Sequence, residues 1–276
     1  MILDAKDFGF TWDDREIKEK KNISFIYKDN DNYAYLNNKL FDIYLEDGGL
    51  MKTRLIFMKK DIISILVGTL NNIPSPDIKC EEVYAFLYNL FFYKNYNDFL
   101  LKLDINDDTF FSYDGNVMCE KRVFLYKTRA SLEEKLKTLK ISNNLILNSL
   151  ETFLKPDYAK KYDSKFTFKD SAFNLDVLKA ILKDIKLKKK NLTTYNNIAY
   201  YLQKAGANEE AIYLLEKILE KFPKRTVAYY NLGDAYWGLG DKTKAIRAYQ
   251  TYIEQMRVKG KSKKIPQIVK DRVLGK

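Results

Sequence analysis

Histidine is absent from this chain of 276 residues, and cysteine occurs only twice. Without histidine the commonest general base is missing, and so are the Ser–His and Cys–His pairs that activate nucleophiles. A conventional zinc site would need carboxylate ligands throughout. Neither of the glycine-rich phosphate-binding patterns, GxxxxGK[ST] and GxGxxG, occurs. We therefore expect a protein that is not an enzyme, with no cofactor; a carboxylate-based site in the N-terminal half is the alternative.

Long uncharged apolar runs are also missing. The longest candidate, residues 61–74, is shorter than the roughly 20 residues that span a bilayer. The N-terminus is acidic and lacks the apolar core of a secretory signal. We expect no membrane span and a cytoplasmic protein, with removal of a leader before this numbering as the alternative. Cys80 and Cys119 are then expected to be unpaired, since a disulfide becomes plausible only in an exported chain.

Two acidic segments, residues 29–32 and 104–108, are candidates for a calcium or magnesium site, because hard cations prefer carboxylate oxygens. Neither segment has the spacing of an EF-hand loop, since the required glycine and the closing glutamate are missing. We expect both segments to be solvated loops and no metal to be bound.

Positive charge is concentrated in the C-terminal half. The net charge is +11, with 21 Lys and Arg against 24 Asp and Glu in residues 1–154, and 27 against 13 in residues 155–276. This imbalance has two interpretations: the lysines are ordinary solvated helix surface, or they form a basic face that binds an acidic partner. The basic segments 186–190 and 259–264 have no readout helix or RNA-binding aromatic motif beside them. The sequence therefore argues against a nucleic-acid partner.

Short strands are predicted in the first 60 residues, where β-branched and aromatic residues alternate with turn-forming Asp, Asn and Gly. The expected strands are residues 23–27, 32–36, 40–45 and 53–58. Their short connections favour an antiparallel meander.

Helical spacing is predicted in the next part of the chain. Val83, Phe86 and Leu87 recur at i, i+3 and i+4, as on the apolar face of a helix. The expected helices are residues 60–72 and one or two helices within 76–103.

A short strand pair is expected after these helices, at residues 109–113 and 117–128, joined across Asp114-Gly115. From Ser131 onward the pattern is helical, and Ser131 stands before Glu134 in the spacing of a capping box. We expect a helix to begin there.

The domain junction is predicted between residues 153 and 174, a polar stretch that contains Pro156 and lacks clean periodicity. The fold class is then α+β. A domain with a mixed antiparallel sheet occupies residues 1–155, and an all-helical domain occupies residues 170–276. An amphipathic helix led by Asn174 opens the second domain.

A repeat of about 34 residues fills most of this second domain, because residues 192–223 align with residues 226–257. In each copy a helix carries a large apolar residue and then a small one, a glycine follows, and a second helix begins with an inward alanine. Antiparallel helices approach closely where both offer small side chains. The expected crossings are Ala199 with Ala211 and Gly233 with Ala245, and the expected helix-ending glycines are Gly206 and Gly240.

This pattern resembles the tetratricopeptide repeat family. The matched residues are Tyr195, Asn197, Ile198, Ala199, Gly206, Ala211 and Pro223 in the first copy, and Tyr229, Asn231, Leu232, Gly233, Tyr236, Gly240, Ala245 and Tyr249 in the second. Ile218 and Tyr252 depart from it, since the family prefers a small residue there. Two repeats bury little by themselves, so we expect the helix at 174–185 and the helix opened by Pro266 to act as caps.

The resemblance implies a concave groove that holds a partner segment and is lined by the first helix of each repeat. The groove-facing residues would be Asn196, Tyr200, Gln203, Tyr230, Asp234 and Trp237. Asp234 argues against a groove that clamps a C-terminal carboxylate. The alternative is that Tyr200 and Trp237 pack against a capping helix or the N-terminal domain.

A protein-binding module is therefore the function that the sequence predicts. Residues 222–256 followed by "KKIP" also look like the repeat tail of bacterial proteins in toxin–immunity systems. The most specific version is a bacterial immunity protein that binds and neutralises a cognate toxin. An assembly scaffold or adaptor is the alternative within the same class, and an enzyme with a carboxylate-based N-terminal site is the alternative in a different class.

Overall fold

The computed structural model describes residues 23–28, 31–45, 51–59, 61–72, 84–97, 99–105, 111–117, 120–122, 129–158 and 167–275. The chain divides into two compact units. The sheet unit comprises Met1–Ser149 and Asp157–Ala172, and the helical unit comprises Leu150–Pro156 and Phe173–Lys276. Among the described residues, the first unit contains two antiparallel sheets, one helix and most of a second helix, and the second unit contains stacked helices, which confirms the α+β class.

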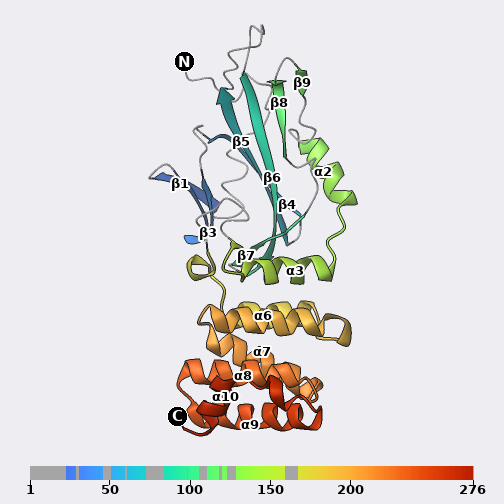
Figure 1. Ribbon diagram of the computed structural model, residues 1–276. Helices are drawn as coiled ribbons and strands as arrows, with labels where there is room; N and C mark the ends of the chain where they lie inside the picture. The colour runs from blue at the N-terminus through green and yellow to red at the C-terminus, as the bar shows by residue number, and fades with distance from the viewer. Residues whose placement is uncertain are drawn as a thin grey trace. The chain divides into compact units, whose positions relative to one another are not determined.

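A three-stranded antiparallel sheet, in the order β1–β2–β3, opens the sheet unit (Figure 1). The strands are β1 (Ile23–Lys28), β2 (Asp31–Leu36) and β3 (Lys39–Leu45). Asn37 and Asn38 make the turn between β2 and β3 with φ of 51° and 63°. Asparagine adopts this left-handed region more readily than most residues. These strands confirm the first part of the expected meander.

The second sheet has the order β4–β5–β6–β8–β9, and β7 also pairs with β6. Its strands are β4 (Met51–Lys59), β5 (Ile62–Asn72), β6 (Tyr84–Tyr96), β7 (Phe99–Lys102), β8 (Phe111–Val117) and β9 (Glu120–Arg122). β4 was expected to continue the meander and instead pairs with β5. β5 covers one edge of β6, while β8 and β7 share the other edge end to end.

The helices predicted at residues 60–72 and 76–103 are wrong, because these segments form β5, β6 and β7. The adjacent side chains of Phe92 and Tyr93 are both buried, with 2% and 0% exposed. A strand covered on both faces loses the apolar–polar alternation that identifies strands in a sequence. A long apolar run of this kind also satisfies helical spacing by chance.

The strand pair near residue 115 is confirmed, but its predicted turn is wrong. Asp114 and Gly115 lie inside β8, opposite Phe86 and Ala85 of β6. The connection to β9 falls at residues 118–119, outside the described ranges. The helix predicted from Ser131 is present as α2 (Arg129–Thr138), but it begins at Arg129, so Ser131 lies within its first turn and not at its cap. α3 (Asn143–Phe153) follows.

Aromatic packing joins β3 to β6 in the core of the sheet unit. The rings of Phe41 and Tyr93 meet edge to face with centroids 5.4 Å apart. Two lysines are buried nearby. Lys94 pairs with Asp61, and the Lys102 ammonium lies 4.2 Å from the ring centroid of Phe91. Such contacts offset part of the cost of removing an ammonium group from water.

Successive helices stack in the helical unit (Figure 1). They are α5 (Leu175–Asp184), α6 (Leu192–Lys204), α7 (Asn208–Lys221), α8 (Thr226–Leu239), α9 (Lys242–Val258) and α10 (Gln267–Val273), with short 3-10 turns at Phe168–Asp170, Lys189–Asn191 and Ser262–Lys264. Asn174 caps α5 by accepting hydrogen bonds from the backbone N–H groups of Asp176 and Val177, as expected. α5 contacts α7, and α10 contacts α9.

The helix-ending glycines take the predicted role. Gly206 and Gly240 have φ of 86° and 89°, in the left-handed region. At the first of these turns, the N–H of Ala207 donates to the carbonyl of Leu202 over 2.9 Å. At the second, the N–H of Asp241 donates to the carbonyl of Tyr236 over 3.0 Å. This is the Schellman pattern, which turns the chain back into the next antiparallel helix.

Small residues line the contacts between the paired helices. Ala199, Ala211 and Ala245 are fully buried. At Gly233 an added Cβ would lie only 2.4 Å from Cε1 of Tyr249. The sequence pairs Gly233 with Ala245, but the group that occupies the space beside the glycine is the Tyr249 ring. The missing side chain therefore makes room for a buried aromatic ring.

Candidate functional site

The six residues predicted to line the groove lie on α6 and α8, three on each helix at spacings of four and three. The two helices contact each other. The exposure of these residues differs. Tyr200 is 37% exposed, whereas Asn196 is 4% exposed and the other four are intermediate. Asn196 therefore contributes to the interior of the helical unit, and Tyr200 contributes to its surface.

Asn196 has a polar atom that the interior does not satisfy. Its Oδ1 is buried and accepts no hydrogen bond from the described residues. An unpaired buried acceptor costs about 1–3 kcal/mol. Asn196 therefore lowers the stability of the interior of the helical unit, one helical turn before Tyr200 on α6.

Asp234 is held by the cap helix. Its Oδ1 accepts a hydrogen bond from Nη1 of Arg272 over 2.8 Å and another from the Tyr249 hydroxyl over 2.7 Å. The Asp234 and Arg272 side chains are 12% and 21% exposed, so the ion pair is largely shielded from water. Burial raises the pKa of the Tyr249 hydroxyl, and the Asp234 carboxylate raises it further. The phenol therefore stays protonated and donates to Asp234 at neutral pH.

Cations flank the aromatic rings of the same face. The guanidinium carbon of Arg272 lies 4.6 Å from the ring centroid of Trp237, and the Lys242 ammonium lies 5.6 Å from it. On α6, the Lys204 ammonium lies 5.4 Å from the ring centroid of Tyr200. Cation–π contacts of this kind are worth about 0.5–1 kcal/mol where they are exposed. We call Tyr200, Lys204, Trp237 and Lys242 the aromatic face.

Tyr230 connects this face to the interior. Its ring centroid lies 5.4 Å from that of Tyr252 and 6.5 Å from that of Tyr249. Burial raises the pKa of the Tyr230 hydroxyl, and the nearby charge of Asp234 raises it further. Gln203 is also on α6, with intermediate burial. Tyr230 thus forms an aromatic cluster with Tyr249 and Tyr252.

Arg272 is the residue of this site that sequence reasoning missed. The sequence predicts a cap helix after Pro266 but not which of its side chains faces α8. One signal was available: Asp234 is a carboxylate on an otherwise apolar and aromatic helix face, and such a group needs a cation partner. Arg272 supplies it, so the predicted groove residues Asp234 and Trp237 partly serve to attach the cap.

The chemistry of the site suits binding. Arg272 neutralises its one carboxylate, and no group of three or more metal-ligating side chains occurs among the described residues. None of the described helices is long and apolar enough to cross a membrane. Aromatic rings flanked by cations are typical of surfaces that hold a protein segment.

The sequence model of the tetratricopeptide repeat family matches residues 190–257, which are α6 to α9 with the residues that join them. No curated protein matches the chain significantly. The family match confirms the repeat that the sequence predicts, and repeats of this family typically mediate protein–protein interaction.

Proposed function

We propose that the aromatic face, which lies on residues that the tetratricopeptide repeat model matches, binds a segment of a partner protein. The observation that carries the proposal is the placement of Tyr200 and Trp237 on contacting helices, each beside a lysine. Aromatic residues supply large contact areas at a low entropy cost and dominate the energetics of many interfaces.

The flanking cations indicate the chemistry of the partner. Lys204 and Lys242 are exposed and lie beside the rings, and neither forms an ion pair with the residues that the structure describes. The half of the chain that contains them carries a large excess of Lys and Arg. An acidic segment with apolar side chains would neutralise these lysines and cover the rings.

The more specific form of this proposal is an immunity protein that neutralises a cognate bacterial toxin. It is supported by the resemblance of the tail from Phe222 to Pro266 to such proteins. A scaffold or adaptor differs in its binding behaviour: it recovers several partners at micromolar affinity, whereas an immunity protein forms one tight one-to-one complex. An enzyme would need converging carboxylates in the sheet unit and turnover of a substrate.

The test begins with affinity capture from the native host on the full-length chain, followed by identification of the retained protein and titration calorimetry with that protein. Tyr200→Ala and Trp237→Ala should each weaken binding about tenfold or more, as expected for central aromatic anchors. Leu239→Ala is the matched control, because Leu239 is an exposed apolar residue at the end of α8. Unchanged affinity in both aromatic variants would refute the aromatic face as the binding site.

The toxin hypothesis has its own readout. Co-expression of the chain should restore growth of cells that produce the captured partner, and Trp237→Ala should reduce this protection. Recovery of several unrelated proteins, none of them toxic, would favour the scaffold instead.

A further inference from the structure

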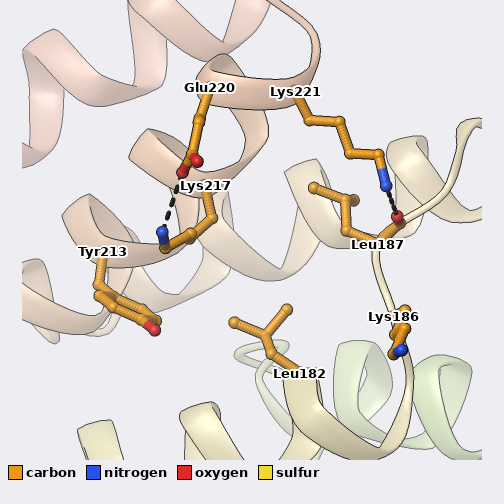
Figure 2. Close-up of a pocket in the computed structure, with 7 residues that line it drawn as sticks. All are labelled: Leu182, Lys186, Leu187, Tyr213, Lys217, Glu220 and Lys221. Atoms are coloured by element: carbon orange, nitrogen blue, oxygen red, sulfur yellow. Dashed lines mark hydrogen bonds and ion pairs between the residues drawn. The ribbon is translucent and has the colours of Figure 1, made fainter.

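A second candidate binding site lies between α5 and α7, on helices that do not carry the aromatic face. It is a cleft of about 460 Å³ lined by Leu182, Lys186, Leu187, Tyr213, Lys217, Glu220 and Lys221. In Figure 2, Leu182 projects from α5, Leu187 comes from the link after α5, and Tyr213 projects from α7. The volume is within the range of pockets that hold small ligands or side chains of a partner, about 300–1,000 Å³.

The floor of the cleft is apolar and its shape is held by polar contacts. Leu187 is 8% exposed, and Leu182 and Tyr213 are half-buried. The Lys221 ammonium donates to the carbonyl oxygen of Leu187 over 2.8 Å, which ties the link to the last turn of α7 (Figure 2). Because this contact is made within the protein itself, the cleft is preformed and a ligand does not have to order the link on binding.

The charge at the rim is positive. The lining contains three lysines and one glutamate, and that glutamate, Glu220, pairs with Lys217 over 2.9 Å. The carbonyl oxygen of Lys186 accepts a hydrogen bond from Nδ2 of Asn191 over 3.1 Å, whereas its exposed ammonium group has no hydrogen-bond or ion-pair partner among the residues that the structure describes. The exposed lysines at positions 188–190 follow immediately in the chain. The lining therefore has a net positive charge, and among its described lysines the Lys186 ammonium is the one left to pair with a ligand.

We infer that this cleft binds an acidic protein segment that carries an apolar side chain between its carboxylates. The apolar side chain would cover Leu182, Leu187 and Tyr213, and a flanking carboxylate would pair with Lys186. Opposite charge at the rim steers the segment to the cleft, and the apolar floor supplies the contact area.

A phosphate ligand fits the same cleft less well. The lining contains no arginine, so a phosphate group would lack the bidentate hydrogen bonds that an arginine side chain provides. The apolar floor would remain exposed beneath a phosphate group. A carboxylate segment with an apolar residue uses both parts of the cleft, so the lining favours it over a nucleic acid.

The test is a nuclear magnetic resonance titration of the full-length chain with labelled leucine methyl groups. The probe is the blocked peptide Asp-Glu-Leu-Glu-Asp. We expect the methyl signals of Leu182 and Leu187 to shift and saturate. The comparison ligands are the peptide with Ser in place of Leu, the basic peptide Lys-Lys-Leu-Lys-Lys, inorganic phosphate and a short single-stranded DNA. All of these should shift the two signals less.

Variants locate the binding and separate it from the aromatic face. Lys186→Glu should weaken binding of the peptide at least about threefold, because it reverses the charge of the residue that pairs with the peptide carboxylate. Lys263→Glu makes the same charge change at an exposed lysine of the turn Ser262–Lys264, which does not line the cleft, and should have no effect on peptide binding. Trp237→Ala should also leave this binding unchanged, even if it abolishes capture of the main partner.

Three results would overturn the inference. They are an absence of shifts at Leu182 and Leu187 at millimolar peptide, equal shifts with phosphate or DNA, and equal affinity of the wild type and Lys186→Glu. Lys186 is exposed, so its substitution does not disturb the packing and the result reports on binding.

Discussion

Gly233 shows at the scale of one residue why this helix contains a glycine. A Cβ there would lie 2.4 Å from Cε1 of Tyr249, a ring that is fully buried and whose hydroxyl is bonded to Asp234. Replacing glycine by alanine in a helix gains about 1 kcal/mol of propensity. Overpacking a held ring costs about 1–3 kcal/mol. We predict that Gly233→Ala lowers the free energy of unfolding by about 1 kcal/mol, measured by thermal melting with far-ultraviolet circular dichroism.

Gly238 on the same helix is the matched control. An added Cβ there would lie 2.8 Å from the side-chain amide of Asn208, whose Oδ1 makes no hydrogen bond with the described residues. The Asn208 side chain can rotate away from the new methyl group without breaking a hydrogen bond of its Oδ1. Gly238→Ala should therefore be neutral or stabilising by up to about 1 kcal/mol. Equal effects of the two substitutions would contradict the role assigned to the Tyr249 ring.

Buried tyrosines predict how stability depends on pH. Burial raises the pKa of the hydroxyls of Tyr195, Tyr236 and Tyr249 above the ordinary value near 10. The folded state then holds these protons more tightly than the unfolded state. Their contribution to stability is complete below pH ~10 and is lost as the pH rises further. The melting temperature should fall as the pH rises above ~10. In Tyr249→Phe, which lacks one of these hydroxyls, the melting temperature should fall less steeply with pH.

At the scale of elements, two side chains attach α10, the fully buried Val269 and Arg272. The helix has seven residues, too few to be stable alone. Arg272 connects it to Asp234 and to the Trp237 ring. Removing one partner of a largely shielded pair leaves the other uncompensated. We predict that Arg272→Ala lowers the free energy of unfolding by about 1–3 kcal/mol, measured by thermal melting.

Lys270→Ala is the control for this prediction, because Lys270 is an exposed residue of the same short helix. It should change stability by less than about 0.5 kcal/mol. A similar loss in both variants would show that helix propensity, and not the Arg272 contacts, holds α10 in place.

The elements differ in how well the sequence predicts them. The paired helices follow from local signals, since Gly206 and Gly240 end helices and the alanines mark their contacts. β5 and β6 cannot be predicted from local signals, because the burial of their side chains depends on partners that are distant in the sequence. Their apolar residues satisfy the helical and the strand period alike.

The candidate site also has one part that the sequence predicts and one part that it does not. The helical period places Tyr200 and Trp237 on the first helices of the two repeats, and the structure puts them there. The contacts of Arg272 require α10 to return to α8 across 38 positions of the chain. No local pattern encodes such a contact, so sequence reasoning assigns Asp234 to a groove but not to its partner.

At the scale of the whole molecule, the division into units makes a prediction about fragments. The helical unit includes Leu150–Pro156, and within it Nδ2 of Asn197 donates to Glu151 over 3.2 Å. Leu150, Phe153 and Leu154 are buried. A fragment of residues 143–276 should therefore be more stable than one of residues 170–276, by about 3 kcal/mol or more. Equal melting temperatures would show that Leu150–Pro156 does not belong to the helical unit.

The stacked arrangement of α6 to α10 also determines how the helical unit opens. Each helix touches mainly its neighbours, so a helix with one neighbouring layer is lost more easily than a helix with two. Amide protons in α10 should exchange with solvent first, those in α9 later, and those in α6 and α7 last. The molecule would then fray stepwise from one end of the stack, and a bound partner that bridges α6 and α8 would slow this fraying.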